Sequence, residues 1–122
     1  MRLSDHFTAS EFRSHDGADL PARCIPRLRA LCTDYLEPLR RNFGPVLIVS
    51  GVRSSQHNAN VGGAPQSYHL CLPRRGGAAA DVRCREGSPK LWHRFLDELE
   101  APGLGLYNSW VHVDTRHGRA RW

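Results

Sequence analysis

The predicted fold starts from residues 103–116, which read GLGLYNSWVHVDTR. Two strand-like segments, residues 104–107 and residues 110–115, flank Asn108 and Ser109, which have the character of a turn. Short segments of this kind on both sides of a two-residue turn predict a β-hairpin. We therefore expect two antiparallel strands near the end of the chain.

Two more strands are predicted upstream of this hairpin. Residues 46–49, VLIV, form a continuous apolar run rich in β-branched residues, which is typical of a buried strand. Residues 79–83, AADVR, predict a strand whose small side chains allow close approach of a neighbouring backbone. Between these strands, residues 51–77 show no regular pattern and predict a long loop, which in a compact domain usually carries function.

Two helices complete the predicted set of elements. Apolar residues recur at helical spacing over residues 21–43, where Pro38 is expected to kink or split the helix. A second helix begins at Ser88, a favourable capping residue followed by proline, and ends before Pro102. The order of elements predicts a single α+β domain spanning residues 1–122, with a small, mainly antiparallel sheet flanked by helices.

The chain has 122 residues and a formal net charge of +5, with Lys90 as its only lysine. A basic surface suits an anionic partner such as nucleic acid, a membrane surface or an acidic cell-wall polymer, and charge alone does not choose between them. The sequence contains no recognised nucleic-acid-binding motif, so we expect no nucleic acid partner. It also lacks the roughly 18-residue apolar run of a membrane span and the apolar core of a secretory signal. We therefore expect no membrane insertion. The chain is expected to be cytoplasmic when made, exported by another route, or a mature domain.

The four cysteines, Cys24, Cys32, Cys71 and Cys84, contain no CxxC pair and do not predict a cysteine-based zinc site. Cys24 and Cys32 are separated by roughly 12 Å along the predicted helix, which is too far for a bond between them. We expect free thiols that fill the core, with pairing to another cysteine as the alternative.

A candidate metal site consists of His69, Asp81 and His112. Two imidazoles and one carboxylate leave the fourth position of a tetrahedral zinc ion for water, as a catalytic site requires. Zinc lowers the pKa of that water to about 7. The spacing alone is a weak signal, because a single histidine on a strand is more often an ordinary surface or core residue. The neighbouring sequence decides between these interpretations.

Several short motifs surround the three residues in a fixed order. They are SGVRS at 50–54, HN at 57–58, VGGA at 61–64, SYHL at 67–70, AADV at 79–82, GLGLY at 103–107 and WVHVDTR at 110–116. Together they resemble the zinc D-alanyl-D-alanine carboxypeptidase family of cell-wall peptidases, with its murein endopeptidase and phage-lysin relatives. The fold of this family is shared with the hedgehog signalling domain. The resemblance covers nearly the whole chain.

The resemblance implies that His69, Asp81 and His112 are the ligands of one zinc ion per chain. It also implies that Arg53 points into the cleft, where a guanidinium suits a substrate carboxylate or a developing oxyanion. Substrate contacts are further predicted for residues flanking the ligands, namely Ser67, Tyr107 and Trp110.

The sequence departs from the family pattern in the spacing of the first two ligands. Relatives usually place the aspartate seven residues after the histidine, whereas Asp81 follows His69 by twelve. Residues 71–75, CLPRR, look like a five-residue insertion. We expect this insertion to bring Cys71 and two arginines near the mouth of the site.

A second departure concerns the general base. Many relatives carry a carboxylate three residues before the last ligand, or a histidine two before it, and Ser109 and Trp110 stand there instead. Asp114 shares a strand face with His112 and is the predicted substitute. Its alternatives are acceptance of the outer ring N–H of a histidine and an ion pair with Arg116 or Arg119. Further candidate bases are His57 and His117, for which a solvated surface position is the favoured alternative. Trp122 is expected to pack in the core, with a position beside the cleft as the alternative.

The resemblance implies a zinc-dependent peptidase that hydrolyses peptidoglycan peptides containing D-amino acids, as a carboxypeptidase or an endopeptidase. The alternative is a catalytically degenerate module of the same fold that binds zinc or cell wall only, which the missing acid before His112 favours. A short chain without a signal fits a phage lysis or tail-associated enzyme. We expect it to act on the cell wall after release or phage delivery, as a monomer or within a larger assembly.

Overall fold

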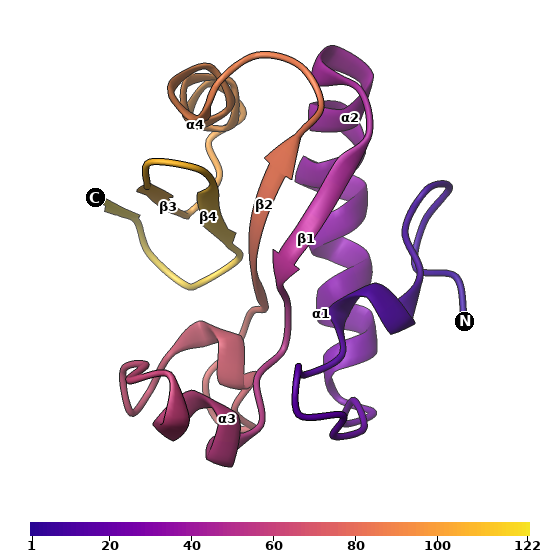
Figure 1. The fold of residues 1–122 in the computed structure, drawn as a ribbon, viewed down its shortest axis with the longest axis vertical. Coiled ribbons are helices and arrows are strands. Elements are labelled where there is room, and N and C mark those ends of the chain that lie inside the picture. Colours follow the sequence, from indigo (N-terminus) through magenta and orange to yellow (C-terminus); the bar gives the residue numbers. More distant parts are fainter.

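The computed structural model describes residues 1–122, which fold around one five-stranded sheet (Figure 1). The strands lie in the order β1-β2-β4-β3-β5 and are antiparallel except for the β3–β5 pair. Their bounds are β1 Val46–Ser50, β2 Ala79–Cys84, β3 Gly103–Leu106, β4 Val111–Asp114 and β5 Ala120–Arg121. The predicted α+β class, the mainly antiparallel sheet and the β3–β4 hairpin are confirmed.

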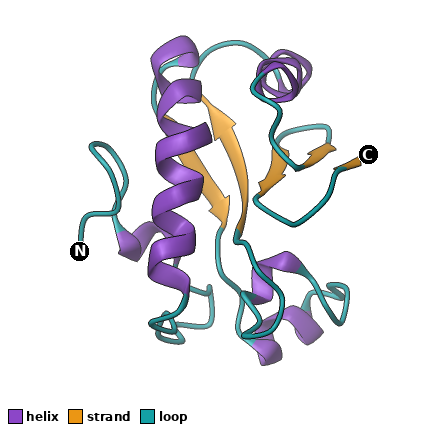
Figure 2. Ribbon diagram, turned by 180° about the vertical axis from the view of Figure 1, so that it is seen from behind, coloured by secondary structure: helices purple, strands orange, loops and turns teal.

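One long helical column crosses a face of the sheet, as the view from behind shows (Figure 2). It consists of α1 (Cys24–Leu31), a π-helical turn (Cys32–Leu36) and α2 (Glu37–Phe43). In the π turn, the N–H of Glu37 donates to the carbonyl of Cys32, five residues back. Pro38 follows at once, and because its ring would crowd the carbonyl of an ordinary α-turn, the wider turn accommodates it. The predicted helix is therefore confirmed, and the proline neither ends nor splits it.

Helix α4 (Pro89–Glu98) begins as expected, since the Ser88 hydroxyl accepts a hydrogen bond from the N–H of Leu91. It packs against β3 and buries Trp92 and Leu96. The core between the helices and the sheet is apolar and includes Leu28, Leu36, Val82, Leu104 and Val113. No helix has both the length and the apolar character needed to cross a bilayer.

The structure contains elements that the sequence analysis missed. Within the predicted loop 51–77 lie α3 (Ser55–Asn60) and a 3₁₀ turn (Tyr68–Leu70). Near the N-terminus, residues 10–12 have the sequence character of a short capped turn, and a 3₁₀ turn spans Ala9–Phe12 there. Helix α3 reads SQHNAN and has no apolar face, so it is defined by its cap: the Ser54 hydroxyl accepts from the N–H of His57. The two-residue strand β5 is too short to carry a pattern.

The expectation of four free thiols was wrong for two of them. Cys24 of α1 and Cys71 form a disulfide, while Cys32 and Cys84 are free. Cys71 lies 47 positions after Cys24, and no local pattern indicates which distant residue the fold places beside a helical cysteine.

Candidate metal centre

The three predicted ligands meet at one end of the sheet. Asp81 of β2 and His112 of β4 are direct cross-strand partners, so their side chains project from the same face. His69 comes from the 3₁₀ turn, whose first residue is capped by Ser67: its hydroxyl accepts from the N–H of His69. The N–H of Arg53 donates to the carbonyl of His69 at 2.7 Å and ties the turn to the end of β1. A strand pair and a fastened turn therefore fix all three side chains.

The ligand atoms of these residues lie close together, and each residue is less than a tenth exposed. His69 Nε2 is 3.3 Å from Asp81 Oδ1, and His112 Nδ1 is 3.0 Å from the same oxygen. The outer nitrogens are also engaged: His69 Nδ1 lies 2.7 Å from the Gly51 carbonyl, and His112 Nε2 lies 2.7 Å from Asp114 Oδ2. Because the carbonyl of Gly51 can only accept, His69 carries a proton on Nδ1, and its Nε2 is the nitrogen that faces Asp81.

This arrangement fits a tetrahedral metal ion with nitrogen and oxygen ligands. Zinc–ligand bonds of 2.0–2.1 Å imply ligand-to-ligand separations of about 3.3 Å, close to those measured around Asp81. All three ligand atoms lie within 4.8 Å of one another. An outer partner on each imidazole is the usual companion of a metal-bound histidine. His69, Asp81 and His112 form a group that could hold a metal ion.

Asp114 lies on the far side of the His112 ring from Asp81 and is fully buried. Its carboxylate accepts from His112 Nε2 and from both Nε and Nη2 of Arg116, at 2.8 and 2.6 Å. Both oxygens are therefore occupied, and neither faces the space between the ligands. These contacts correspond to the outer-partner and ion-pair alternatives for Asp114.

Two glycines of β3 make room for this arrangement. Gly103 is the cross-strand partner of Asp114, and a Cβ there would overlap the carboxylate. Gly105 is the partner of His112, and a Cβ there would overlap the Trp122 ring. The glycines of the GLGLY motif therefore have a steric role: the space that a side chain at Gly103 or Gly105 would fill is occupied by Asp114 and Trp122, which contact His112.

The charges of the cluster depend on one another. Burial would raise the pKa of Asp81, but hydrogen bonds from His112 and His69 outweigh it and hold that pKa well below its usual range. Burial likewise opposes ionisation of Asp114, whose pKa is lowered by Arg116 and His112. For His112, burial alone would lower the pKa, and the two carboxylates raise it. Both carboxylates are thus anions, and a metal ion competes with a proton at His112.

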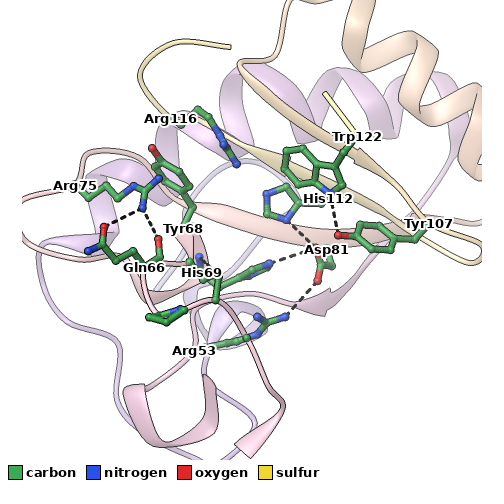
Figure 3. Close-up of a pocket in the computed structure, with 14 residues that line it drawn as sticks. Arg53, Gln66, Tyr68, His69, Arg75, Asp81, Tyr107, His112, Arg116 and Trp122 are labelled. Atoms are coloured by element: carbon green, nitrogen blue, oxygen red, sulfur yellow. Dashed lines mark hydrogen bonds and ion pairs between the residues drawn. The ribbon is translucent and has the colours of Figure 1, made fainter. Parts of the chain in front are cut away.

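A cavity of about 660 Å³ opens over the ligands (Figure 3). Arg53 lines it, with its side chain 17% exposed and Nη2 3.6 Å from Asp81 Oδ2. Arg53 Nη1 is held 3.4 Å from Oδ1 of the buried Asn58 in α3. The remaining lining residues are Gly63, Ala64, Pro65, Gln66, Ser67, Tyr68, His69, Arg75, Asp81, Tyr107, His112, Arg116 and Trp122.

The structure brings some of the predicted substrate contacts to this cavity and not others. Ser67 and Tyr107 line it, whereas Trp110 lies behind Tyr107, its ring stacked with a centroid separation of 5.1 Å. Neither His57 nor His117 lines it. His57 packs against His15, and His117 is exposed.

Trp122 was expected in the core and instead lies in the cavity wall, 47% exposed. Strand β5 carries the chain end alongside β3, and the N–H of Trp122 donates to the Leu104 carbonyl. Its ring lies 5.0 Å from that of His112, and its Nε1 donates to the Tyr107 hydroxyl at 2.9 Å. Because Gly105 has no side chain, the Trp122 ring can occupy the space above it and lie against His112 instead of packing in the core.

The insertion 71–75 reaches the cavity through one residue. Arg75 lines it, Arg74 is exposed outside it, and Cys71 is buried in the disulfide with Cys24. Only one of the two arginines expected at the mouth therefore faces the site.

The comparisons with known proteins agree with the geometry. A family model described as Peptidase M15 matches residues 4–114, which is nearly the whole chain. No curated protein and no solved structure matches it significantly.

Proposed function

Because the chain belongs to the M15 peptidase family, we propose that it is a zinc-dependent peptidase that hydrolyses D-amino-acid-containing peptides of peptidoglycan. The observation that supports this most is the convergence of His69, Asp81 and His112, whose ligand atoms lie within 4.8 Å of one another under an open cavity. The ligands are His69 Nε2, His112 Nδ1 and the Asp81 carboxylate. When bound, zinc supplies hydroxide at neutral pH and polarises the scissile carbonyl.

The other residues of the cavity hold and orient the substrate. Arg53 binds a substrate carboxylate or the developing oxyanion, because its guanidinium faces the same space as Asp81. Asp114 is a positioning residue that keeps the Nε2 proton on His112 and leaves Nδ1 free to bind metal. Ser67 is also a positioning residue, because its hydroxyl caps the turn that carries His69.

Tyr107 supplies a hydroxyl to the reacting carbonyl. Its oxygen accepts a hydrogen bond from Trp122 Nε1 at 2.9 Å, so its own proton remains free to donate into the cavity. A neutral donor of this kind stabilises negative charge that develops on the carbonyl oxygen.

A second candidate function is supported by what the cavity lacks. Asp81 is the only carboxylate among its lining residues, and it belongs to the ligand set. A peptidase of this mechanism needs a group that moves a proton from water to the leaving amine. A module that binds zinc and cell wall without cleaving it is therefore the alternative.

The deciding experiment is mass spectrometry of muropeptides after incubation with the zinc-loaded protein. Cleavage supports the peptidase, and the fragments distinguish a terminal residue released by a carboxypeptidase from an internal cut. His112→Ala should lose both zinc and cleavage, whereas His117→Ala, an exposed histidine outside the cavity, should keep both. Wild-type protein that holds one zinc ion, binds cell wall and cleaves nothing would support the alternative.

The proposed place of action is the cell wall, reached by release or by phage delivery. The net charge of +5 supports attraction to an anionic wall polymer. We propose a monomer or a component of a larger phage or wall-associated assembly.

A further inference from the structure

The insertion 71–75 is fastened to α1 at several points. The disulfide joins Cys71 to Cys24, and Arg23 Nε donates to the Cys71 carbonyl at 2.9 Å. Arg27 Nη1 donates to the carbonyls of Leu72 and Arg75 at 2.9 and 3.2 Å. A loop whose carbonyls are tied to a core helix does not need a ligand to order it. The insertion therefore presents Arg75, its last residue, to the cavity in a fixed position.

Arg75 is stacked as well as fastened. Its guanidinium carbon lies 4.0 Å from the centroid of the Tyr68 ring, and that of Arg116 lies 4.4 Å from the same centroid. Figure 3 shows the Tyr68 ring between the two arginines. Stacking fixes the plane of a guanidinium and leaves its edges free for hydrogen bonds in that plane.

The two stacked arginines differ in their charge balance. Arg116 forms a two-point ion pair with the buried Asp114 and is neutralised. Arg75 uses Nη1 to hold the Gln66 carbonyl at 2.7 Å and has no acidic partner. Its remaining N–H groups therefore belong to an uncompensated cation in the wall of the cavity.

The cavity is cationic on both sides of the ligands. Arg53 stands beside Asp81, and the Arg75–Tyr68–Arg116 stack stands on the other side of His69 (Figure 3). With Arg116 neutralised by Asp114, Arg53 and Arg75 face a single acidic side chain in the lining, Asp81. A divalent ion on that carboxylate would leave Arg53 without its anionic neighbour too. Such a site favours a ligand with more than one negative group.

We propose that Arg75, held against Tyr68, forms a second carboxylate subsite, so that the peptide taken by this cavity carries an acidic group besides the one that Arg53 meets. This inference rests on the proposed function, which identifies the ligand as a peptide, and it adds the chemical group by which the peptide is selected. Tyr68 and Arg116 orient the Arg75 fork, and the fastened insertion keeps it in place.

The test compares two probes that differ only in charge: N-acetyl-D-glutamyl-D-alanine and N-acetyl-D-glutaminyl-D-alanine. Their dissociation constants are measured by calorimetry on the zinc-loaded and the chelator-treated protein, together with the zinc content. The glutamyl probe should bind about tenfold more tightly, because a charge-assisted bidentate contact replaces a neutral one. Arg75→Gln should reduce this preference to within about twofold while the zinc content stays the same.

Arg74→Gln is the matched control, since it removes the same charge one residue away from an exposed position outside the cavity. Arg74→Gln should keep the tenfold preference. Arg75→Lys should keep part of it, because lysine retains the positive charge but lacks the two parallel N–H donors of a guanidinium. A wild-type preference near one, a preference unchanged in Arg75→Gln, or an equal loss in Arg74→Gln would overturn the subsite. Because binding to the chelator-treated protein requires no turnover, this result is separate from whether peptidoglycan is cleaved.

Discussion

Replacing Asp114 by asparagine separates its two predicted roles. The carboxylate is fully buried and accepts from His112 and three times from Arg116, including the Arg116 backbone N–H at 3.1 Å. Asparagine keeps the shape but puts an N–H₂ group where one pair of donors now meets an oxygen, and it leaves Arg116 unpaired. Breaking a buried ion pair costs about 3–5 kcal/mol. The Arg116 side chain remains 19% exposed, so water offsets part of this, and we expect about 2–4 kcal/mol.

The same change should weaken zinc binding. Without the anion, the Nε2 proton of His112 is no longer favoured over the Nδ1 proton, and loss of such an outer partner lowers metal affinity about 10- to 100-fold. Stability is measured by urea denaturation of chelator-treated protein, because bound zinc would itself add to the unfolding free energy. Zinc affinity is measured by competition with a chromogenic chelator.

The control is Asp97→Asn, whose carboxylate is 44% exposed and pairs with Arg119 and Arg121. It should cost less than about 1 kcal/mol and leave zinc affinity unchanged. If Asp114→Asn keeps wild-type stability and zinc affinity but loses hydrolysis alone, the reasoning is refuted and Asp114 is the base after all.

Two further predictions concern a glycine and a buried glutamate. Gly103→Ala places a methyl group against the Asp114 carboxylate, so it should lower zinc affinity as Asp114→Asn does. Its control is Gly62→Ala, where the methyl group meets open space: the positive φ should lower the unfolding free energy by only about 1 kcal/mol and leave zinc binding intact. The pKa of Glu37 is lowered, because hydrogen bonds from Ser4 and His6 outweigh the burial that would raise it. Its contribution to stability is present above the unfolded pKa of about 4.5 and is lost as pH falls through the lower folded value. The difference in unfolding free energy between wild type and Glu37→Gln should therefore shrink below pH 4.5, and a constant difference in denaturant titrations would contradict this.

Sequence patterns were informative wherever one face of an element is buried. The alternation in 110–115 predicted that His112 and Asp114 share a face, and β4 places them so. Two-residue alternation, however, does not distinguish an aspartate that faces the ligands from one behind the imidazole. The cross-strand register of Gly103 with Asp114 decides that question, and register depends on a strand pairing that alternation alone does not specify.

The prediction failed where long-range contacts determine local structure. Trp122 follows the two-residue strand β5, which forms by pairing with β3. The disulfide and the arginine contacts of the insertion join segments more than forty residues apart. Family resemblance selected the three residues that meet in the candidate metal site, but it could not describe residues 71–75, which have no counterpart in the pattern.

The site divides its tasks between the sheet and the loops. Asp81, His112 and Asp114 lie on adjacent central strands, where hydrogen bonds on both sides hold them, and the metal ligands need that rigidity. The cations that face a substrate come from loops: Arg53 follows β1 and Arg75 ends the insertion. Changes at Arg53 or Arg75 should therefore alter which peptide binds while zinc stays bound, and changes at Asp81, His112 or Asp114 should lower the affinity for zinc. Arg75→Gln should change the peptide preference and keep the zinc affinity, whereas Asp114→Asn should lower the zinc affinity. Equal changes in zinc affinity in the two variants would contradict this separation of roles.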